Sequence, residues 1–326
     1  RAAASRDARR GGAEMNPSAP AIEAVDIHRS YDGSMALEGL SLEVAAGTIC
    51  GLIGPDGAGK TTLMRILCGL LHPDGGSARI LGHDCATDIR SVKEAIGYMP
   101  QRFSLYTDLS VSENIRFFAD MFAVPADERL RIEKRLMEFS RLGPFSDRRA
   151  GKLSGGMKQK LALSCTLIHT PKVLLLDEPT TGVDPVSRQE FWEILRSLRG
   201  DGLALLVSTP YMDEAALCDD VVLMYGGRTI ERGAPSDLVG RYPRRLMAIR
   251  GEKVAEVLGL LREKGPEEMS VHRFGDHLRF SLEDERQESL VREAVSGMDV
   301  RLERVDPGIE DVFVESIRRS KAKGTM

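Results

Sequence analysis

The chain contains 326 residues, of which 42% are hydrophobic, 5% aromatic and 29% charged, the composition of an ordinary soluble globular protein. At roughly 150 residues per domain, this length predicts about two domains and excludes a single short module. The formal net charge of −4 and the pI near 6.0 argue against a general binder of nucleic acid or anionic membranes, because such proteins usually carry a basic excess.

Residues 1–20 are small, rich in arginine and broken by proline and glycine, and they lack the apolar central region of a secretory signal. We expect them to form a disordered tail. Met15 stands just before the patterned sequence, which makes it a candidate translation start. A transit peptide is the alternative, although Asp7 and Glu14 count against it.

From residue 21 the pattern is strand-like, residues 48–53 then form a continuous apolar run that ends in glycines, and a helical pattern follows over residues 59–71. This order predicts a strand, a glycine-rich loop and a helix. Residues 111–165 are mostly helical in period, because apolar residues recur three and four positions apart.

Strand-like runs return at 172–177, 203–208 and 220–224, with a helical pattern over 185–199 between the first two. Strands that alternate with helices predict a largely parallel sheet covered on both faces, so we assign residues 21–240 to one α/β domain. No window of 18 residues is free of charge, so the chain is not expected to span a membrane by itself.

The pattern changes after about residue 240. The expected elements are a strand over 245–250, a helix over 252–264, strands over 269–274 and 277–282, a helix over 284–296, a strand over 298–304 and a final helix over 308–321. The order β-α-β-β-α-β is that of a small ferredoxin-like unit. We therefore expect residues 241–326 to form an α+β accessory domain.

The five cysteines, at positions 50, 68, 85, 165 and 218, form no C-x-x-C pair and lie mostly in apolar stretches. This distribution is typical of reduced thiols in the core of a cytosolic protein. Neither disulfides nor zinc are expected.

One segment matches the phosphate-binding pattern G-x-x-x-x-G-K-[ST] and lies between a predicted buried strand and a predicted helix. Its residues are Gly54, Pro55, Asp56, Gly57, Ala58, Gly59, Lys60 and Thr61, followed by Thr62. Glycines let such a loop curl so that backbone N–H groups point inward, while Lys60 can reach the β- and γ-phosphates and Thr61 can ligate Mg²⁺. The alternative is a plain glycine-rich turn.

The apolar run 173–176 is followed by Asp177 and Glu178. Such a run belongs in a sheet interior, where its end would place Asp177 beside the phosphate loop to hold Mg²⁺ through water. Glu178 is then suited to orient the attacking water. The alternative is that the two acidic residues merely end a strand and cap a helix. This alternative could explain the phosphate loop or the acidic strand end alone, but it explains the two motifs together poorly.

The sequence L-S-G-G-M-K-Q begins at Leu153 and opens a helical run, where Ser154, Gly155 and Gly156 would present hydroxyl and N–H donors. An L-S-G-G-x-x-Q segment between a P-loop and an L-L-L-D-E-P strand resembles the signature of the ATP-binding subunits of ABC transporters. The resemblance covers about residues 22–240. It implies a P-loop NTPase core with a helical signature subdomain, and a head-to-tail pair of such domains that encloses two nucleotides.

The resemblance also implies roles for single positions. Tyr31 in R-S-Y-D-G would stack on adenine, unless it is a core or surface tyrosine. Gln101 in Y-M-P-Q would reach Mg²⁺ and the lytic water, and Asp184 in G-V-D-P would lie in the loop that crosses the dimer. Asp56 stands where many members have asparagine, a minor departure because either side chain stabilises the turn.

One departure from the family pattern is serious. In S-T-P-Y-M-D-E-A the family normally has histidine where this sequence has Pro210. Imidazole can hydrogen-bond the γ-phosphate, whereas proline has neither a side-chain donor nor a backbone N–H. None of the six histidines is placed by sequence near this loop. We therefore expect ATP binding with slowed hydrolysis.

Residues 241–326, and especially D-P-G-I-E-D-V-F near their end, resemble the C-terminal extension of drug-exporter ATPases of the daunorubicin-resistance type. The resemblance implies a role in pairing subunits. The alternative is a small packing domain without a regulatory role. Ligand sensing is less favoured, because the segment contains no recognisable phosphate, metal or nucleophile constellation.

Together these features predict an ATPase, with ATP and Mg²⁺ as cofactors, that is the motor subunit of an exporter for drugs or other small molecules. It would be cytoplasmic and peripheral on the inner face of the cell membrane, with a separate integral-membrane permease and a second ATP-binding subunit as partners and no nucleic acid. Catalysis is assigned to Glu178, Gln101 and Lys60, and metal binding to Thr61, Gln101 and Asp177. Pro210 favours a heterodimer, in which another chain supplies the histidine, over a homodimer. The patch that faces the permease would include Phe103, Leu105 and Tyr106.

Other functions stay open at this point. A soluble ABC ATPase of translation or DNA repair usually joins two ATPase domains or carries a long coiled coil, whereas this chain has one P-loop and no sustained heptad run. A regulatory protein that binds ATP without hydrolysis is compatible with Pro210. An ordinary P-loop kinase would not need L-S-G-G-x-x-Q.

Overall fold

The fold comes from a computed structural model, which describes residues 19–102, 105–264 and 269–322. The tail expected over residues 1–20 lies outside these ranges except for its last two residues. Within the described ranges, no helix has both the length and the hydropathy that crossing a bilayer would need.

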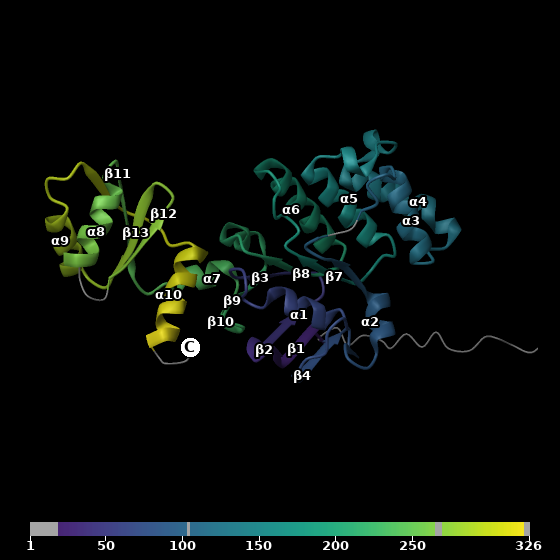
Figure 1. The fold of residues 1–326 in the computed structure, drawn as a ribbon, viewed down its shortest axis with the longest axis horizontal. Helices are drawn as coiled ribbons and strands as arrows, with labels where there is room; N and C mark the ends of the chain where they lie inside the picture. The colour runs from purple at the N-terminus through teal and green to yellow at the C-terminus, as the bar shows by residue number, and fades with distance from the viewer. Residues whose placement is uncertain (1–18, 103–104, 265–268, 323–326) are drawn as a thin grey trace, which may run out of the picture. The chain divides into compact units, whose positions relative to one another are not determined.

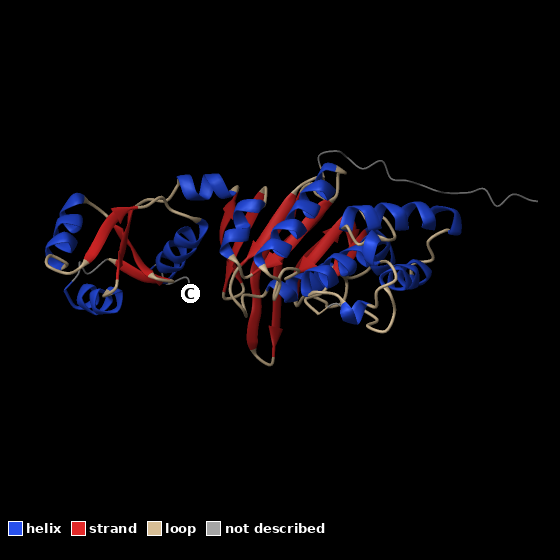
Figure 2. Cartoon of the chain, turned by 90° about the horizontal axis from the view of Figure 1, so that it is seen from above, coloured by secondary structure: helices blue, strands red, loops and turns tan. Residues whose placement is uncertain are grey.

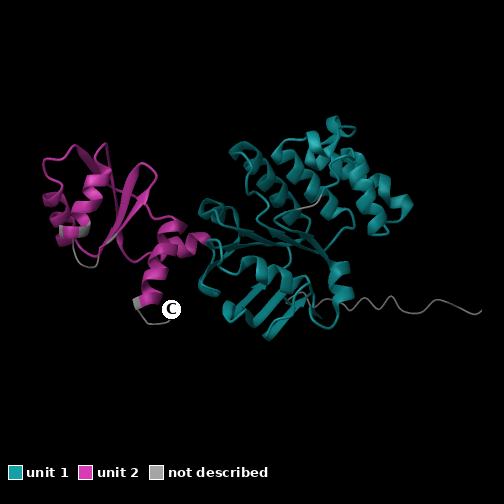
Figure 3. Cartoon of the chain, viewed as in Figure 1, with its two compact units in different colours: residues 1–234, 326 teal, residues 235–325 magenta. Residues whose placement is uncertain are grey.

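The chain forms two compact units that divide between Ala234 and Pro235 (Figure 3). The expected boundary at residue 240 lies later in the sequence. It differs because helix α7 (Pro235–Gly240) contacts the C-terminal helix α10 (Ile309–Ala322), which places α7 in the second unit.

The first unit is built on a six-stranded sheet. Its strands, in spatial order, are β10 (Arg228–Gly233), β9 (Asp220–Tyr225), β3 (Ile49–Ile53), β8 (Ala204–Thr209), β7 (Val173–Asp177) and β6 (Ile96–Met99). Neighbouring strands run parallel except β10, which pairs antiparallel with β9. Every residue of β3, β7 and β8 is buried, as strands covered on both faces require. The predicted largely parallel sheet is confirmed.

A second sheet of the first unit is antiparallel and was not predicted as a separate layer. Its strands, in spatial order, are β2 (Ser34–Val44), β1 (Ile22–Tyr31), β4 (Gly75–Ile80) and β5 (His83–Asp84). Register shifts interrupt the β1–β2 pairing, and two glycines open β4. These irregularities weaken the strict alternation by which such strands are recognised in a sequence.

Helices cover both faces of the large sheet (Figure 1). They are α1 (Lys60–Leu67), α2 (Ile89–Ala95), α3 (Val111–Met121), α4 (Ala126–Ser140), α5 (Gly155–Leu167) and α6 (Pro185–Gly200), with short 3-10 turns at Gly143–Phe145, Ala150–Lys152 and Met212–Leu217. Figure 1 shows α1 between the two sheets and α3 to α6 on the opposite side of the large sheet. Figure 2 shows these helices in blue beside the red strands. A capping box of Ser110 and Glu113 starts α3.

The helix predicted over residues 59–71 is wrong at its C-terminal end, because α1 stops at Leu67. Gly69 adopts a φ of +65°, a left-handed conformation that closes helices, and its N–H bonds the carbonyl of Ile66. Leu70, which the longer helix would have placed in the apolar pattern, is 58% exposed.

The core of the first unit is continuous across its layers. Buried side chains of both sheets, including Ile22 and Leu52, pack in one cluster with Leu63 and Leu67 of α1. This packing fixes α1 on the end of β3. The loop between them is therefore held at both ends by the core.

All five cysteines lie within the described ranges, where their thiols are free and buried. Burial raises the pKa of both Cys50 and Cys85 to about 12. Such thiols are poor nucleophiles, in agreement with a structural role in the core.

The second unit contains a four-stranded antiparallel sheet. Its strands, in spatial order, are β12 (Ser270–Phe274), β13 (His277–Leu282), β11 (Arg245–Gly251) and β14 (Val300–Arg304), and its remaining helices are α8 (Val254–Lys264) and α9 (Glu285–Ala294). Met247 and Phe280 of the sheet share one core with Val257 and Val291 of the helices. The elements from β11 to β14 occur in the order β11, α8, β12, β13, α9, β14, which is the β-α-β-β-α-β order of ferredoxin-like folds. We therefore propose that this unit is ferredoxin-like.

Candidate functional site

The phosphate-binding loop connects the carboxyl end of β3 to the first residue of α1. Gly59, just before the helix, has a φ of +100°, and a Cβ atom there would lie 2.4 Å from the carbonyl oxygen of Ala36. Only glycine accepts both this conformation and this close approach. The glycine in the motif therefore lets the loop curl before the helix, as an anion-binding loop requires.

An open cleft of about 820 Å³ lies in front of this loop. Its volume falls within the range of roughly 300–1,000 Å³ that small-molecule sites have. The first residues of α1 line the cleft, so the positive end of the helix dipole faces it. No side chain of the described residues caps this helix start, and its first turn has no acidic residue, so its N–H groups remain available to an anion. The cleft is lined by Tyr31, Ala36, Pro55, Asp56, Gly57, Ala58, Gly59, Lys60, Thr61, Thr62, Gln101, Glu178, Thr181, Pro210 and Tyr211.

Lys60 is only 4% exposed, although it carries a charge. Its Nζ atom donates hydrogen bonds to the carbonyl oxygens of Gly54 at 2.8 Å and Pro55 at 3.0 Å, and it lies 3.4 Å from Oε1 of Glu178. A buried ammonium group needs such oxygen partners. The loop thus holds a cation directly at the start of α1, where phosphate oxygens would meet it.

Asp177, at the end of β7, lies beside the first turn of α1. The hydroxyl of Thr61 donates to Asp177 Oδ1 at 3.1 Å, and the hydroxyl of Ser208 donates to the same oxygen at 2.7 Å. Asp177 Oδ2 is buried and has no hydrogen-bond partner among the described residues. A carboxylate oxygen without a partner next to a threonine hydroxyl fits Mg²⁺, which prefers such hard oxygen ligands.

Glu178 is held at the cleft by three donors. Its Oε2 atom accepts hydrogen bonds from Gln101 Nε2 at 2.8 Å and from the hydroxyl of Thr181 at 3.3 Å, while Lys60 faces Oε1. Its φ is +51°, an uncommon conformation for a residue with a side chain. The backbone N–H of Glu178 donates to both the hydroxyl and the carbonyl oxygen of Ser208, at 3.0 and 3.1 Å. These two hydrogen bonds hold Glu178 in this conformation.

Ser208 is a residue of this site that sequence reasoning missed. It lies opposite Asp177 in the parallel pairing of β7 and β8, so its hydroxyl reaches both acidic residues that end β7. The signal that identifies it is a polar residue at the end of an apolar strand next to the strand that ends in Asp177 and Glu178.

Tyr31 and Pro210 lie on the rim of the same cleft. Tyr31 is 40% exposed, and the guanidinium of Arg29 lies 5.2 Å from its ring centroid. Pro210 is followed by Tyr211, whose N–H bonds the hydroxyl of Thr209 at 3.1 Å. None of the described residues that line the cleft is a histidine. No histidine among the described lining residues therefore replaces the side-chain donor that Pro210 lacks.

Ser154, Gly155, Gly156 and Asp184 do not line this cleft. Ser154 caps α5 and Asp184 caps α6, where a hydrogen bond from the N–H of Ser187 lowers the pKa of the Asp184 carboxyl. The two helix starts touch, since a Cβ atom on Gly156 would lie 2.4 Å from the side chain of Ser187. The predicted site residues therefore form two groups, one around the cleft and one at the starts of α5 and α6.

Known proteins resemble this chain in sequence and in fold. A family model described as ABC transporter matches residues 37–181. The chain is 34% identical over 305 residues to Nod factor export ATP-binding protein I of Rhizobium sp. (strain N33), which covers 93% of this chain and 99% of the relative. The chain belongs to the ABC transporter ATP-binding proteins.

A longer relative of this ABC protein is the probable multidrug ABC transporter ATP-binding protein YbhF of Escherichia coli (strain K12), with 43% identity over 281 residues. That alignment covers 86% of this chain and 49% of the relative, so the chain spans about half the length of that protein. Among solved structures, cbiO1 from Clostridium perfringens, part of an ABC transporter complex, matches with a TM-score of 0.64 and 26% identity. This match covers 75% of the ABC protein and 97% of that chain, and it confirms the P-loop NTPase fold.

Proposed function

We propose that the chain binds and hydrolyses ATP at the cleft in front of α1. The observation that carries this proposal is the convergence of Lys60, Thr61, Gln101 and Glu178 on one cleft, although they come from segments far apart in the sequence. Lys60 and the N–H groups at the start of α1 would bind the β- and γ-phosphates. Glu178, oriented by Gln101, would orient the attacking water and accept its proton. The exposed ring of Tyr31 would stack on adenine.

Mg²⁺ fits the residues beside the phosphate loop. Thr61 and Asp177 would hold the ion, with Gln101 as the third expected contact, and the unpartnered Asp177 Oδ2 supplies an anionic oxygen. The bound ion supplies positive charge that neutralises phosphate oxygens. Ser208 keeps the Asp177 carboxylate in place through its 2.7 Å hydrogen bond.

The names of the relatives, multidrug transport and Nod factor export, favour an exporter over the ABC ATPases of translation or DNA repair. We infer that the chain drives export of small molecules through a separate integral-membrane permease, from the cytoplasmic face of the membrane. An exposed apolar surface supports this partner. It consists of Tyr106, Phe117, Met121 and Phe122, which are 47%, 37%, 56% and 39% exposed.

This surface follows Gln101 in the sequence: Tyr106 precedes α3, Phe117 and Met121 lie on it, and Phe122 directly follows it. The rings of Tyr106 and Phe117 are 4.4 Å apart between centroids. Exposed aromatic side chains that gather in one place are typical of interaction sites. Leu105, also expected there, is half-buried, and Phe103 lies outside the described residues.

The second partner is another ATP-binding subunit. Ser154 and Asp184 lie outside the chain's own cleft, which supports a pairing in which they complete the site of the partner. Because Pro210 offers no donor to the γ-phosphate, we favour a heterodimer whose other chain carries the histidine. A homodimer in which Glu178 and Gln101 suffice is the competing assembly.

Titration calorimetry of the purified chain with ATP, with Mg²⁺ and then with the metal chelated, tests the nucleotide site. Binding that weakens at least tenfold without Mg²⁺ is expected. The absence of ATP binding would refute the proposal.

Co-purification with a permease tests the proposed membrane partner. Tyr106→Glu should abolish capture of the permease, because it places a charge on the apolar surface. Leu130→Glu is the matched control, since Leu130 is 73% exposed on α4 but lies outside that surface. Equal capture by both variants would refute the docking surface.

A further inference from the structure

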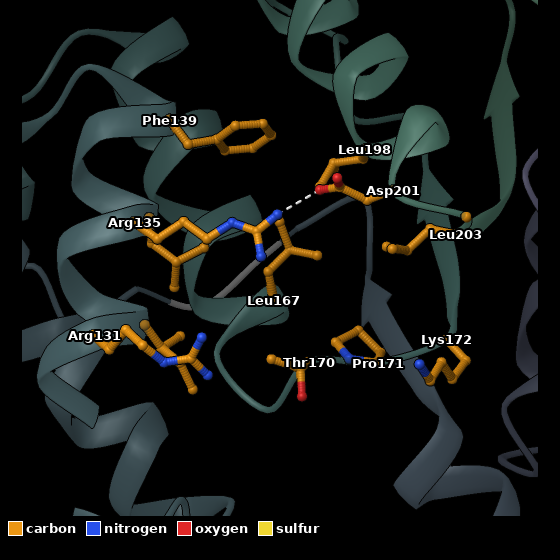
Figure 4. Close-up of a pocket in the computed structure, with 13 residues that line it drawn as sticks. Arg131, Arg135, Phe139, Leu167, Thr170, Pro171, Lys172, Leu198, Asp201 and Leu203 are labelled. Atoms are coloured by element: carbon orange, nitrogen blue, oxygen red, sulfur yellow. Dashed lines mark hydrogen bonds and ion pairs between the residues drawn. The ribbon is translucent and has the colours of Figure 1, made fainter. Parts of the chain in front are cut away.

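A second pocket, of about 360 Å³, lies in the first unit apart from the nucleotide cleft (Figure 4). Its walls come from α4 on one side and, on the other, from the C-terminal ends of α5 and α6 and the loops that lead into β7 and β8. The lining residues are Arg131, Ile132, Arg135, Leu136, Phe139, Leu167, Thr170, Pro171, Lys172, Leu198, Asp201, Gly202 and Leu203. None of these residues lines the nucleotide cleft.

The two pockets lie at opposite ends of one strand. β7 starts next to Lys172 in the second pocket and ends at Asp177 beside the phosphate loop. At about 3.3 Å per residue, the strand separates them by roughly 15 Å. One small molecule therefore cannot occupy both, and a ligand of the second pocket would bind together with ATP.

The wall of the second pocket is apolar. Ile132 and Leu136 of α4 face the pocket together with Leu167 of α5 and Leu198 of α6, and each of these side chains is at most 7% exposed. They belong to three different helices, so the pocket lies where the helices fail to fill the space between them. A surface of this kind attracts the apolar body of a ligand.

The mouth of the pocket carries an excess of positive charge. Arg131, Arg135 and Lys172 lie around it, whereas Asp201 is the one carboxylate among the described lining residues. Arg135 forms an ion pair with Asp201 across the pocket, drawn as a dashed line in Figure 4. Within the described ranges, neither Arg131 nor Lys172 has an ion-pair partner. Two cations therefore remain available beside an apolar wall.

We propose that this pocket binds a small organic anion with an apolar body of up to three aromatic rings, such as an aryl sulfonate or an aryl carboxylate. The apolar body packs against Leu136, Leu167 and Leu198, and the anionic group pairs with Arg131 and Lys172. The volume, at the small end of the range for ligand sites, sets the size limit. The unpaired cations select an anion over a neutral molecule.

Anilinonaphthalenesulfonate and its uncharged analogue N-phenylnaphthylamine are the matched probes, because both become fluorescent in apolar sites. They are titrated into the full chain with saturating Mg·ATP, which blocks the nucleotide cleft. We expect one bound sulfonate per chain and an affinity at least tenfold higher than that of the neutral probe, since two ion pairs near the surface contribute roughly that factor. Equal affinities would overturn the proposal.

Variants locate the bound probe. The double variant Arg131→Glu with Lys172→Glu should weaken sulfonate binding at least tenfold and leave the neutral probe unchanged, whereas Leu203→Trp should weaken both because the indole fills the pocket. Lys134→Glu is the control, since Lys134 lies on α4 outside the pocket. Unchanged Mg·ATP affinity shows that each variant is folded. Wild-type sulfonate binding by Leu203→Trp or by the double variant would place the probe elsewhere and overturn the proposal.

Discussion

Replacement of Ser208 by alanine tests the geometry around the two acidic residues without changing a residue that lines the cleft. The Ser208 hydroxyl donates to Asp177 Oδ1 at 2.7 Å and accepts from the N–H of Glu178 at 3.0 Å. In Ser208→Ala the carboxylate of Asp177 keeps only Thr61 among its described donors. The N–H of Glu178 keeps its bond to the carbonyl oxygen of Ser208 at 3.1 Å.

The magnitude follows from these two bonds. A hydrogen bond to a charged group contributes roughly 1.5–3 kcal/mol, and its loss inside the protein leaves a buried acceptor with one partner fewer. The second bond is partly retained by the backbone carbonyl and adds little. We therefore expect Ser208→Ala to lower the free energy of unfolding by about 2 kcal/mol. The same loss of order at Asp177 should lower kcat/KM for Mg·ATP by roughly tenfold.

Urea denaturation measures the first effect, and a Mg²⁺ titration of ATP turnover measures the second. Ser164→Ala is the control, because Ser164 is equally buried and its hydroxyl donates to the carbonyl oxygen of Lys160 at 2.9 Å, within α5. The Ser164 hydroxyl bonds a carbonyl that already belongs to the hydrogen-bonded backbone of α5. Ser164→Ala should therefore lower the free energy of unfolding by less than about 1 kcal/mol and leave the Mg²⁺ requirement of ATP turnover unchanged. If the two variants lose equal stability and share one Mg²⁺ requirement, the role assigned to Ser208 is wrong.

Three further outcomes are expected. Lys60→Ala should weaken ATP binding at least tenfold in calorimetry. Glu178→Gln should spare ATP binding, lower ATP turnover at least hundredfold and accumulate an ATP-bound dimer in size-exclusion chromatography. Unchanged hydrolysis by Glu178→Gln would falsify the role of Glu178. In the heterodimer, Ser154→Arg should lower turnover of the assembled pair more than Pro210→His raises it, and turnover by the unmutated chain alone at about one per second or faster would contradict that assembly. Burial raises the pKa of the Cys50 thiol from 9.0 to about 12, so the folded state holds this proton more tightly than the unfolded state. The contribution of Cys50 to the free energy of unfolding is therefore complete below about pH 9 and should fall as the pH rises toward 12. At neutral pH iodoacetamide should alkylate Cys50 only after unfolding in urea, and equal rates in native and unfolded protein would disprove its burial.

The parts of the fold that could be predicted are those with contiguous signals. The glycine-rich loop before Lys60 and the apolar run before Asp177 each combine a buried strand with a chemical motif, and both lie where the sequence indicates. The antiparallel sheet of β1, β2, β4 and β5 carries no such motif. Its bulges and its glycines break the alternation that would have identified it.

The site shows the same division. Lys60, Thr61 and Glu178 could be predicted because their motifs assign their chemistry, whereas Tyr31 and Gln101 were predicted from the family resemblance. Ser208 was missed because its role depends on which strand lies next to β7, and strand order is not written in a single motif. The second pocket is further from prediction, since Arg131 of α4 and Leu203, just before β8, come to line one pocket only because α4 packs against α5.

The contact between the starts of α5 and α6 has a consequence for the proposed pairing of subunits. Since Gly156 leaves no room for a side chain against Ser187, the residues Ser154 and Asp184 are presented by one rigid surface rather than by two independent loops. A partner that meets a preordered surface loses less conformational entropy on association, and so needs less buried area to reach a given affinity. If subunits pair through Ser154 and Asp184 as proposed, any larger residue at position 156 would separate the two helix starts and weaken that association before it changed any step at the nucleotide.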